Sequence, residues 1–161
     1  MNSEYELLHV RLSGTGGQGV ILMGKLLAEA TAIHAGFNVV MTKSYGPEAR
    51  GGACRSDIII CRGEIDALAG TEPNILVCLS QQACNRYFNN AAPPDIFLID
   101  STSVKVVPTS RAVEVPLTEL ATGKLQNPMT VNILALGVLG GLINLVEQEA
   151  LASAIRGNVR E

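Results

Sequence analysis

The fold is decided by residues 7–19, LLHVRLSGTGGQG, and by the long apolar run that follows them to Gly36. Residues 7–12 are short, mostly apolar and stopped by glycines, which predicts a β-strand that enters a tight turn. Residues 20–35 carry apolar side chains around most of a helical surface, and Gly36 can supply the left-handed end. The stretch therefore predicts a strand, a glycine turn and a helix.

The glycine turn is a candidate cofactor-binding loop. Closely spaced glycines let backbone N–H groups approach a phosphate, and the following helix N-terminus adds positive potential. A nicotinamide dinucleotide is disfavoured, because Thr42 and Lys43 stand where a ribose-binding acid is expected after the second strand. The alternative is that the glycines only permit a sharp turn and close helix packing. The candidate residues are Gly14, Thr15, Gly16, Gly17, Gln18 and Gly19.

Composition limits the classes of function. The chain has 161 residues, 47% of them hydrophobic, which suits one domain spanning residues 1–161 with a substantial core. A net charge of −3 and 4% aromatic residues give little support for nucleic-acid binding. The mean hydropathy of +0.27 is high for a soluble monomer and favours an apolar surface covered by a partner.

The four cysteines, Cys54, Cys61, Cys78 and Cys84, lack the paired spacing of zinc or iron–sulfur ligands. We therefore expect buried thiols and no metal site on this chain. Residues 1–6 are polar and acidic and do not resemble a secretion signal, so a reduced cytoplasmic location is expected.

Strand and helix patterns alternate along the rest of the chain. Apolar strands are expected at residues 37–43, 57–61, 74–79, 96–99 and 112–115. Helices are expected at residues 81–88, after Ser80, and at 147–156. This alternation predicts an α/β fold, a three-layer arrangement with a mainly parallel sheet flanked by helices and a Rossmann-like glycine turn after the first strand.

Two further features need an interpretation. His9 and Arg11 lie on one face of the first strand, and His9 is expected to be a partly exposed structural histidine rather than a ligand or base. Residues 129–146, after Asn127 and Pro128, are almost wholly apolar. Interior asparagines and following acidic residues favour a buried or interface helix over a membrane span there.

A second motif covers residues 44–56, SYGPEARGGACRS. Its glycines and proline exclude regular structure through the middle, yet it holds aromatic and charged side chains suited to an interface or an anion. A plain surface loop is the alternative. The expected interface residues are Tyr45, Gly46, Pro47, Glu48, Arg50, Gly51 and Gly52.

Both motifs, with Asn132 in the late helix, resemble the gamma subunit or gamma domain of 2-oxoacid:ferredoxin oxidoreductases over nearly the whole chain. The form of the second motif is most similar to the 2-oxoglutarate enzymes, while the pyruvate, 2-oxoisovalerate and indolepyruvate enzymes share much of it. The resemblance implies a heteromeric complex that converts 2-oxoglutarate and coenzyme A to succinyl-CoA and carbon dioxide and reduces ferredoxin.

The resemblance also implies how the chemistry is divided. Thiamine diphosphate, magnesium and iron–sulfur clusters would lie on alpha, beta and ferredoxin-like delta partners. None of the residues of this chain is expected to be catalytic, and it would hold no cofactor alone. Residues 14–19 would contact coenzyme A phosphates, and residues 45–52 would line a subunit interface. No membrane contact is implied, and the isolated chain could form a homodimer. A stand-alone nucleotide sensor and a pure scaffold remain alternative functions.

Overall fold

The computed structural model describes residues 7–46, 52–65 and 72–158. Its six strands are β1 (Leu7–Thr15), β2 (Asn38–Ser44), β3 (Ala53–Cys61), β4 (Ile75–Cys78), β5 (Ile96–Asp100) and β6 (Val113–Val115). Its α-helices are α1 (Val20–Glu29), α2 (Gln81–Tyr87), α3 (Leu117–Glu119), α4 (Val131–Ile143) and α5 (Gln148–Asn158). Short π segments cover Ala30–His34 and Leu120–Lys124, and a 3-10 turn covers Pro128–Thr130.

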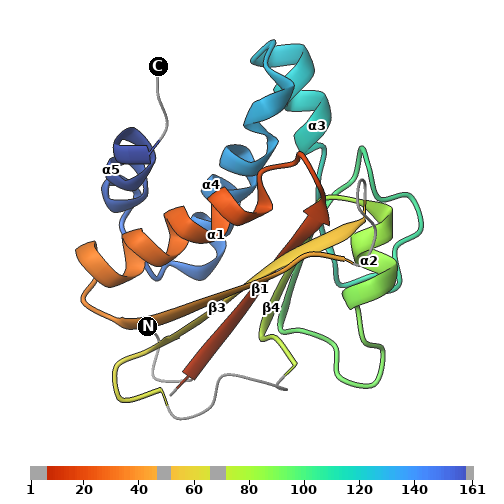
Figure 1. The fold of residues 1–161 in the computed structure, drawn as a ribbon. Helices are drawn as coiled ribbons and strands as arrows, with labels where there is room; N and C mark the ends of the chain where they lie inside the picture. The colour runs from red at the N-terminus through yellow and green to blue at the C-terminus, as the bar shows by residue number, and fades with distance from the viewer. Residues whose placement is uncertain (1–6, 47–51, 66–71, 159–161) are drawn as a thin grey trace.

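The strands form one sheet in the order β2-β3-β1-β4-β5-β6 (Figure 1). Strands β1, β4, β5 and β6 pair in parallel, whereas β3 pairs antiparallel with both β1 and β2. Of the strands that the structure describes, only β3 therefore runs against the others. The expectation of a mainly parallel sheet between helices is confirmed. The sequence pattern did not show that β3 would insert between the first two strands.

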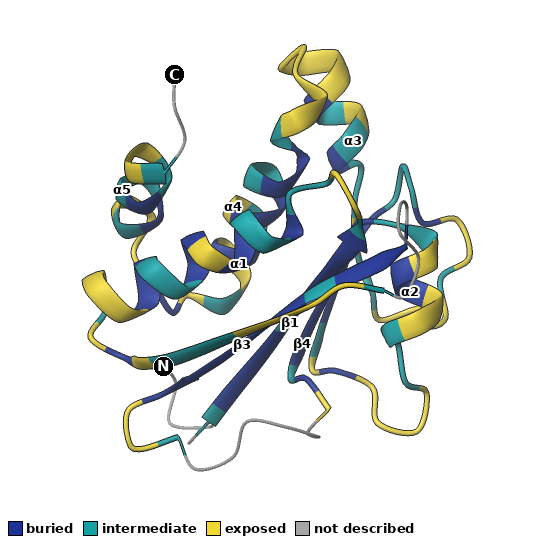
Figure 2. Ribbon diagram, in the orientation of Figure 1, coloured by how far each residue is buried: buried dark blue, intermediate teal, exposed yellow. Residues whose placement is uncertain are grey.

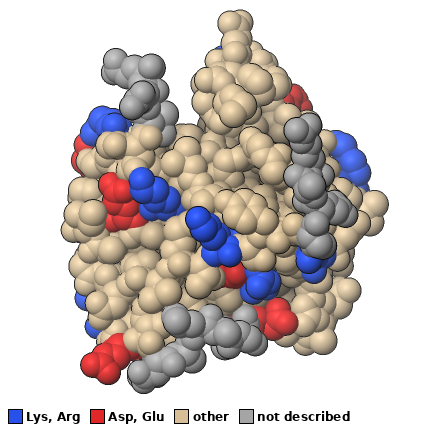
Figure 3. All heavy atoms as spheres, in the orientation of Figure 1, with Lys and Arg blue, Asp and Glu red and all other residues tan. Residues whose placement is uncertain are grey.

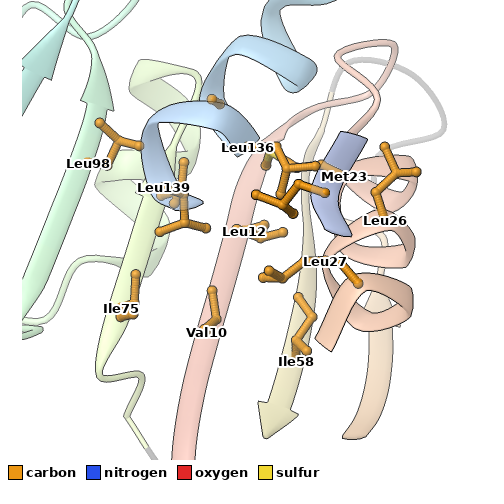
Figure 4. Packing of buried hydrophobic residues seen from close by; sticks show 14 of the residues in the cluster. Val10, Leu12, Met23, Leu26, Leu27, Ile58, Ile75, Leu98, Leu136 and Leu139 are labelled. Atoms are coloured by element: carbon orange, nitrogen blue, oxygen red, sulfur yellow. The ribbon is translucent and has the colours of Figure 1, made fainter. Parts of the chain in front are cut away.

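Helices cover the two faces of the sheet unequally. Helices α1, α4 and α5 pack on one face, where alternate residues of β1 and β3 join one large apolar cluster (Figure 4). Leu12, Met23, Leu27, Ile58 and Leu136 are all fully buried there. The other face has a smaller apolar cluster beneath α2, centred on β4 and β5. Figure 2 shows that the central strands are buried while α2 and the π segment after α1 keep exposed sides.

Local sequence rules explain most element ends. Gly36 has φ +69° just after the π turn, as expected of a left-handed helix stop. The Ser80 hydroxyl accepts a hydrogen bond from the Ala83 amide and caps α2. The Asn127 side chain accepts one from the Met129 amide before the 3-10 turn that leads into α4. The expected helix over residues 20–35 exists, but its last turn is widened into a π turn.

Two expectations about single residues are wrong. His9 is 4% exposed, not partly exposed, because the face of β1 that carries it is covered and its ring contacts Asp57. Arg55, in the motif of residues 44–56 and outside the strand expected at residues 57–61, belongs to strand β3, which already begins at Ala53. Both errors have the same cause, because β3 is longer than its apolar run and brings charged residues onto a covered face.

Candidate functional site

The glycine turn lies where neighbouring parallel strands send their chains to opposite faces of the sheet. Strand β1 continues through the turn to α1 on one face, and β4 continues through Leu79 to α2 on the other (Figure 1). The carboxyl ends of two such strands form the crevice in which open α/β sheets bind their ligands. The fold therefore places residues 14–19 at the usual ligand position.

Gln18 holds the turn in shape. Its side-chain Oε1 accepts hydrogen bonds from the Thr15 backbone N–H at 2.7 Å and from the Thr15 hydroxyl at 3.1 Å. Its Nε2 donates to the Leu79 carbonyl at 2.9 Å, which ties the turn to the chain leaving β4. Gly17 has φ +94° with open space around its Cα, so the bend needs glycine for its conformation alone.

Gly19 is required both for its backbone conformation and because a side chain there would clash. It has φ +69°, and a Cβ added there would lie within 3.0 Å of both Cγ and Nδ2 of Asn132. Asn132 is 3% exposed, and its Nδ2 donates to the Gly19 carbonyl at 3.2 Å from helix α4. The turn is therefore locked to α4 by a side chain 113 residues away in sequence.

The helix that follows the turn has no side-chain cap. Gly19 is the N-cap residue of α1, and no side chain among the described residues bonds the first amides of this helix. Such amides need an acceptor, and the helix dipole favours a negative one. Gly16 and Gly17 are exposed beside them. These features fit a phosphate group held by backbone N–H donors.

The second motif is only partly described. Tyr45 is 66% exposed, and Gly46 lies so close to the next strand that an added Cβ would come within 2.9 Å of the Ala53 carbonyl. Gly52 is buried just before β3. Pro47, Glu48, Arg50 and Gly51 lie outside the described residues. Tyr45 follows β2, the edge strand of the sheet, and an exposed tyrosine there is suited to a protein interface.

A charged cluster occupies the sheet face opposite α1. The Asp57 carboxylate accepts hydrogen bonds from His9 Nε2 at 2.8 Å and from Arg11 Nε at 2.7 Å. Arg55 Nε lies 3.0 Å from the other carboxylate oxygen. Burial raises the pKa of Asp57, but the bonds from His9 and Arg11 and the charges of Arg11 and Arg55 outweigh burial and lower the pKa overall.

Tyr87 of α2 lies against this cluster. The guanidinium carbons of Arg11, Arg55 and Arg86 lie 5.9, 5.5 and 5.7 Å from the centre of its ring. Its hydroxyl donates to the Ala53 carbonyl at 3.3 Å. A cavity of about 780 Å³ opens beside the ring, and we call it the arginine pocket. It is lined by Arg11, Ser44, Arg55, Glu72, Arg86, Tyr87, Phe88, Asn89, Asn90 and Ala91.

All four cysteines are buried and free, as the spacing predicted. Burial and a contact with Cys84 raise the pKa of Cys78, while the hydrogen bond from Cys78 lowers the pKa of Cys84. In residues 7–46, 52–65 and 72–158, no three histidine, cysteine or acidic side chains gather in a way that could hold a metal ion. Within the same ranges no helix is long and apolar enough to cross a membrane.

Residues 9–161 match the family described as pyruvate ferredoxin/flavodoxin oxidoreductase. The chain belongs to this family. Among curated members, 2-oxoglutarate synthase subunit KorC of Methanocaldococcus jannaschii is 40% identical over 93% of this chain and 82% of its own length. The KorC subunit of Archaeoglobus fulgidus is 37% identical over 96% of this chain and 80% of its own. These relatives are subunits of oxidoreductase complexes.

Solved structures of the family have the same fold. The gamma subunit of a keto/oxoacid ferredoxin oxidoreductase from Geobacter sulfurreducens superposes with a TM-score of 0.84 at 34% identity, over 98% of this chain and 87% of that one. The 2-oxoglutarate:ferredoxin oxidoreductase of Magnetococcus marinus also gives 0.84, at 23% identity, over 96% of this chain but only 27% of that longer polypeptide. The α/β fold expected from the sequence is thus the fold of a family gamma subunit.

Sequence reasoning missed two parts of the site. It singled out Asn132 as a family feature but not as the partner of Gly19, because their contact joins distant segments. It also placed no acidic partner beside His9, although Asp57 starts a predicted strand. Opposed charges on two strands would have suggested the pair only if their antiparallel register had been known.

Proposed function

We propose that this chain is the gamma subunit of a 2-oxoglutarate:ferredoxin oxidoreductase, which forms succinyl-CoA and carbon dioxide from 2-oxoglutarate and coenzyme A. The observation that carries the proposal is the 34–40% identity to 2-oxoglutarate synthase KorC subunits over at least 93% of the chain. Relatives named ketoisovalerate oxidoreductase subunit VorA are 30–31% identical, and the match spans 32% of their length.

In this proposal the chain supplies binding and assembly, and its partners supply the chemistry. Thiamine diphosphate, magnesium and the iron–sulfur clusters lie on alpha, beta and delta partners, and ferredoxin accepts the electrons. Tyr45 and its motif, residues 45–52, then line the interface with a partner.

Coenzyme A is the ligand proposed for the glycine turn. Its phosphate groups are anions of the kind that an uncapped helix N-terminus and exposed glycine amides attract. The turn is held rigid from both sides by Gln18 and Asn132, so its amides are fixed in direction before a ligand arrives. The protein would therefore orient coenzyme A without touching the reacting thiol or the 2-oxoacid.

The subunit role is tested by omission and replacement. The complex is purified with and without this chain, and coenzyme A-dependent reduction of a viologen or ferredoxin is measured with 2-oxoglutarate, pyruvate and 2-oxoisovalerate. We expect activity to require the chain and to be highest with 2-oxoglutarate. Full activity without the chain would contradict the role, and preference for another oxoacid would move the assignment to that enzyme.

The coenzyme A role is tested with two matched glycines. Gly17 and Gly36 both have positive φ and open space around them, so alanine at either position costs a similar amount, about 1 kcal/mol. We expect Gly17→Ala to raise the KM for coenzyme A several-fold, because a change in the bend at residue 17 would redirect the backbone amides of the turn. Gly36→Ala should leave that KM unchanged. Equal KM values for both variants would mean that the glycines serve the turn alone.

A further inference from the structure

The charges around the arginine pocket are not balanced within the described part of the chain. Asp57 is the carboxylate that pairs with Arg11 and Arg55, and both arginines reach it through Nε. Arg86 has no ion pair among the described residues and only its contact with the Tyr87 ring. Glu72 also lines the cavity, where it accepts a hydrogen bond from Asn89. Three guanidinium groups thus face two carboxylates.

Burial strengthens the charge interactions at the base of this pocket. The side chain of Arg11 is 11% exposed and that of Asp57 is 10% exposed, so water screens their charges poorly. Arg55 Nε is also buried and makes no hydrogen bond in the described structure, although it lies near Asp57. Asp57 offsets the charges of Arg11 and Arg55, whereas Arg86 has no carboxylate partner among the described residues. The excess positive charge beside the Tyr87 ring therefore favours a further negative group.

The pocket has the size and lining for a small ligand. Its volume of about 780 Å³ lies within the range of small-molecule sites. Ser44, Asn89 and Asn90 add neutral hydrogen-bonding groups to the guanidinium groups. A phosphate monoester offers three terminal oxygens, whereas a carboxylate offers two, so phosphate is better able to engage three arginines together.

We propose that the arginine pocket binds the phosphate monoester group of a small molecule. The pocket lies on the α2 side of the sheet, whereas the glycine turn leads into α1 on the opposite side. Arg11 and Arg55, held by Asp57, form its floor, and the exposed Arg86 also lines it. This assignment is independent of the coenzyme A role of residues 14–19.

The experiment uses the 161-residue chain, with phenyl phosphate as probe and benzoate as the carboxylate analogue at constant ionic strength. Backbone amide NMR shifts are followed during each titration. We expect saturable shifts at Tyr87, Asn89 and Ala91 with phenyl phosphate, and weaker binding of benzoate. Shifts confined to residues 14–19, or no saturation at about 10 mM probe, would overturn the pocket assignment. Benzoate binding as tight as phenyl phosphate would overturn the choice of phosphate.

Charge variants distinguish a specific binding site from nonspecific attraction by the positive charge of the protein. Arg86 is exposed and lies outside the Asp57 ion pairs, so Arg86→Gln should fold normally. We expect it to weaken phenyl phosphate about tenfold, as for loss of one charged hydrogen bond, and Arg86→Lys to restore part of the affinity. Arg111→Gln, an equal charge change at an exposed position outside the pocket, should alter it less than about twofold. Equal losses in Arg86→Gln and Arg111→Gln would overturn the proposal.

Discussion

The two faces of strand β1 are built by opposite means. Val10 and Leu12 point into an apolar cluster with α1 and α4, whereas His9 and Arg11 point into a charged cluster around Asp57. Both faces are buried, yet apolar packing tolerates small shifts, while a buried carboxylate depends on each donor around it. One strand therefore joins a face held by apolar packing to a face held by paired charges.

The largest expected effect is on the charged face. Replacing Asp57 with Asn keeps the shape but leaves Arg11 and Arg55 without their counter-charge. We expect Asp57→Asn to lower the free energy of unfolding by about 4 kcal/mol, as when one partner of a buried ion pair is removed. Urea unfolding measures the loss. Glu114→Gln, at an exposed position on β6, is the matched control and should lose less than about 0.5 kcal/mol.

A loss below about 1 kcal/mol in Asp57→Asn would contradict the role given to this carboxylate. The cluster would then be solvated in solution, and the difference between the two faces of β1 would disappear. The arginine pocket would also lose the fixed floor on which its proposed ligand depends.

The apolar face is expected to show a slightly smaller effect. Leu12 is fully buried beneath α1 and α4 (Figure 4), so Leu12→Ala removes apolar contacts and leaves a cavity. We expect a loss of about 3 kcal/mol in the free energy of unfolding. Leu142→Ala, at a 40% exposed position of α4, should lose much less in the same assay. Equal losses at the two leucines would mean that the apolar face is not close-packed.

The two faces of β1 also show which features of the structure could be predicted from the sequence and which could not. The alternation of apolar and polar residues in β1 predicted which residues face the helices, and the caps at Ser80 and Asn127 predicted where helices begin. Patterns within one segment cannot show which distant strand will pair with it. The insertion of β3, the burial of His9 and the bond between Asn132 and Gly19 all depend on such long-range pairing.

The molecular surface also differs between the two sides of the sheet. On the face seen in Figure 3, acidic and basic side chains are scattered among large areas of other residues. Helix α4 is apolar on nearly all sides, and its outer residues Gly137 and Leu142 are exposed, as is Met129 in the 3-10 turn before it. The predicted partner-covered apolar surface thus has a candidate in this helix, while the arginine pocket lies on the other side of the sheet.

A smaller effect is expected where the glycine turn meets α4. Gly19→Ala must adopt positive φ and must displace Asn132. We expect a loss of about 2 kcal/mol, from left-handed strain and the broken Asn132 bond together. In a double-mutant cycle with Asn132→Ala, the combined loss should be smaller than the sum of the single losses, because the clash is removed. Additive losses would mean that the two residues do not contact each other.

The smallest expected effect is on how the free energy of unfolding depends on pH. The pKa of Asp57 is lower in the folded chain than its ordinary value of 3.8, so the ionised carboxylate stabilises the fold above about pH 4. As pH falls through the folded pKa, Asp57 is protonated and that stabilisation is lost. The difference in unfolding free energy between wild type and Asp57→Asn should therefore shrink as the pH falls below about 4. The difference between wild type and Leu12→Ala should not change with pH over the same range, because no titrating group is removed. If the Leu12→Ala difference shrank in parallel, acid would be loosening the whole sheet, and the pH dependence could not be assigned to the charged face.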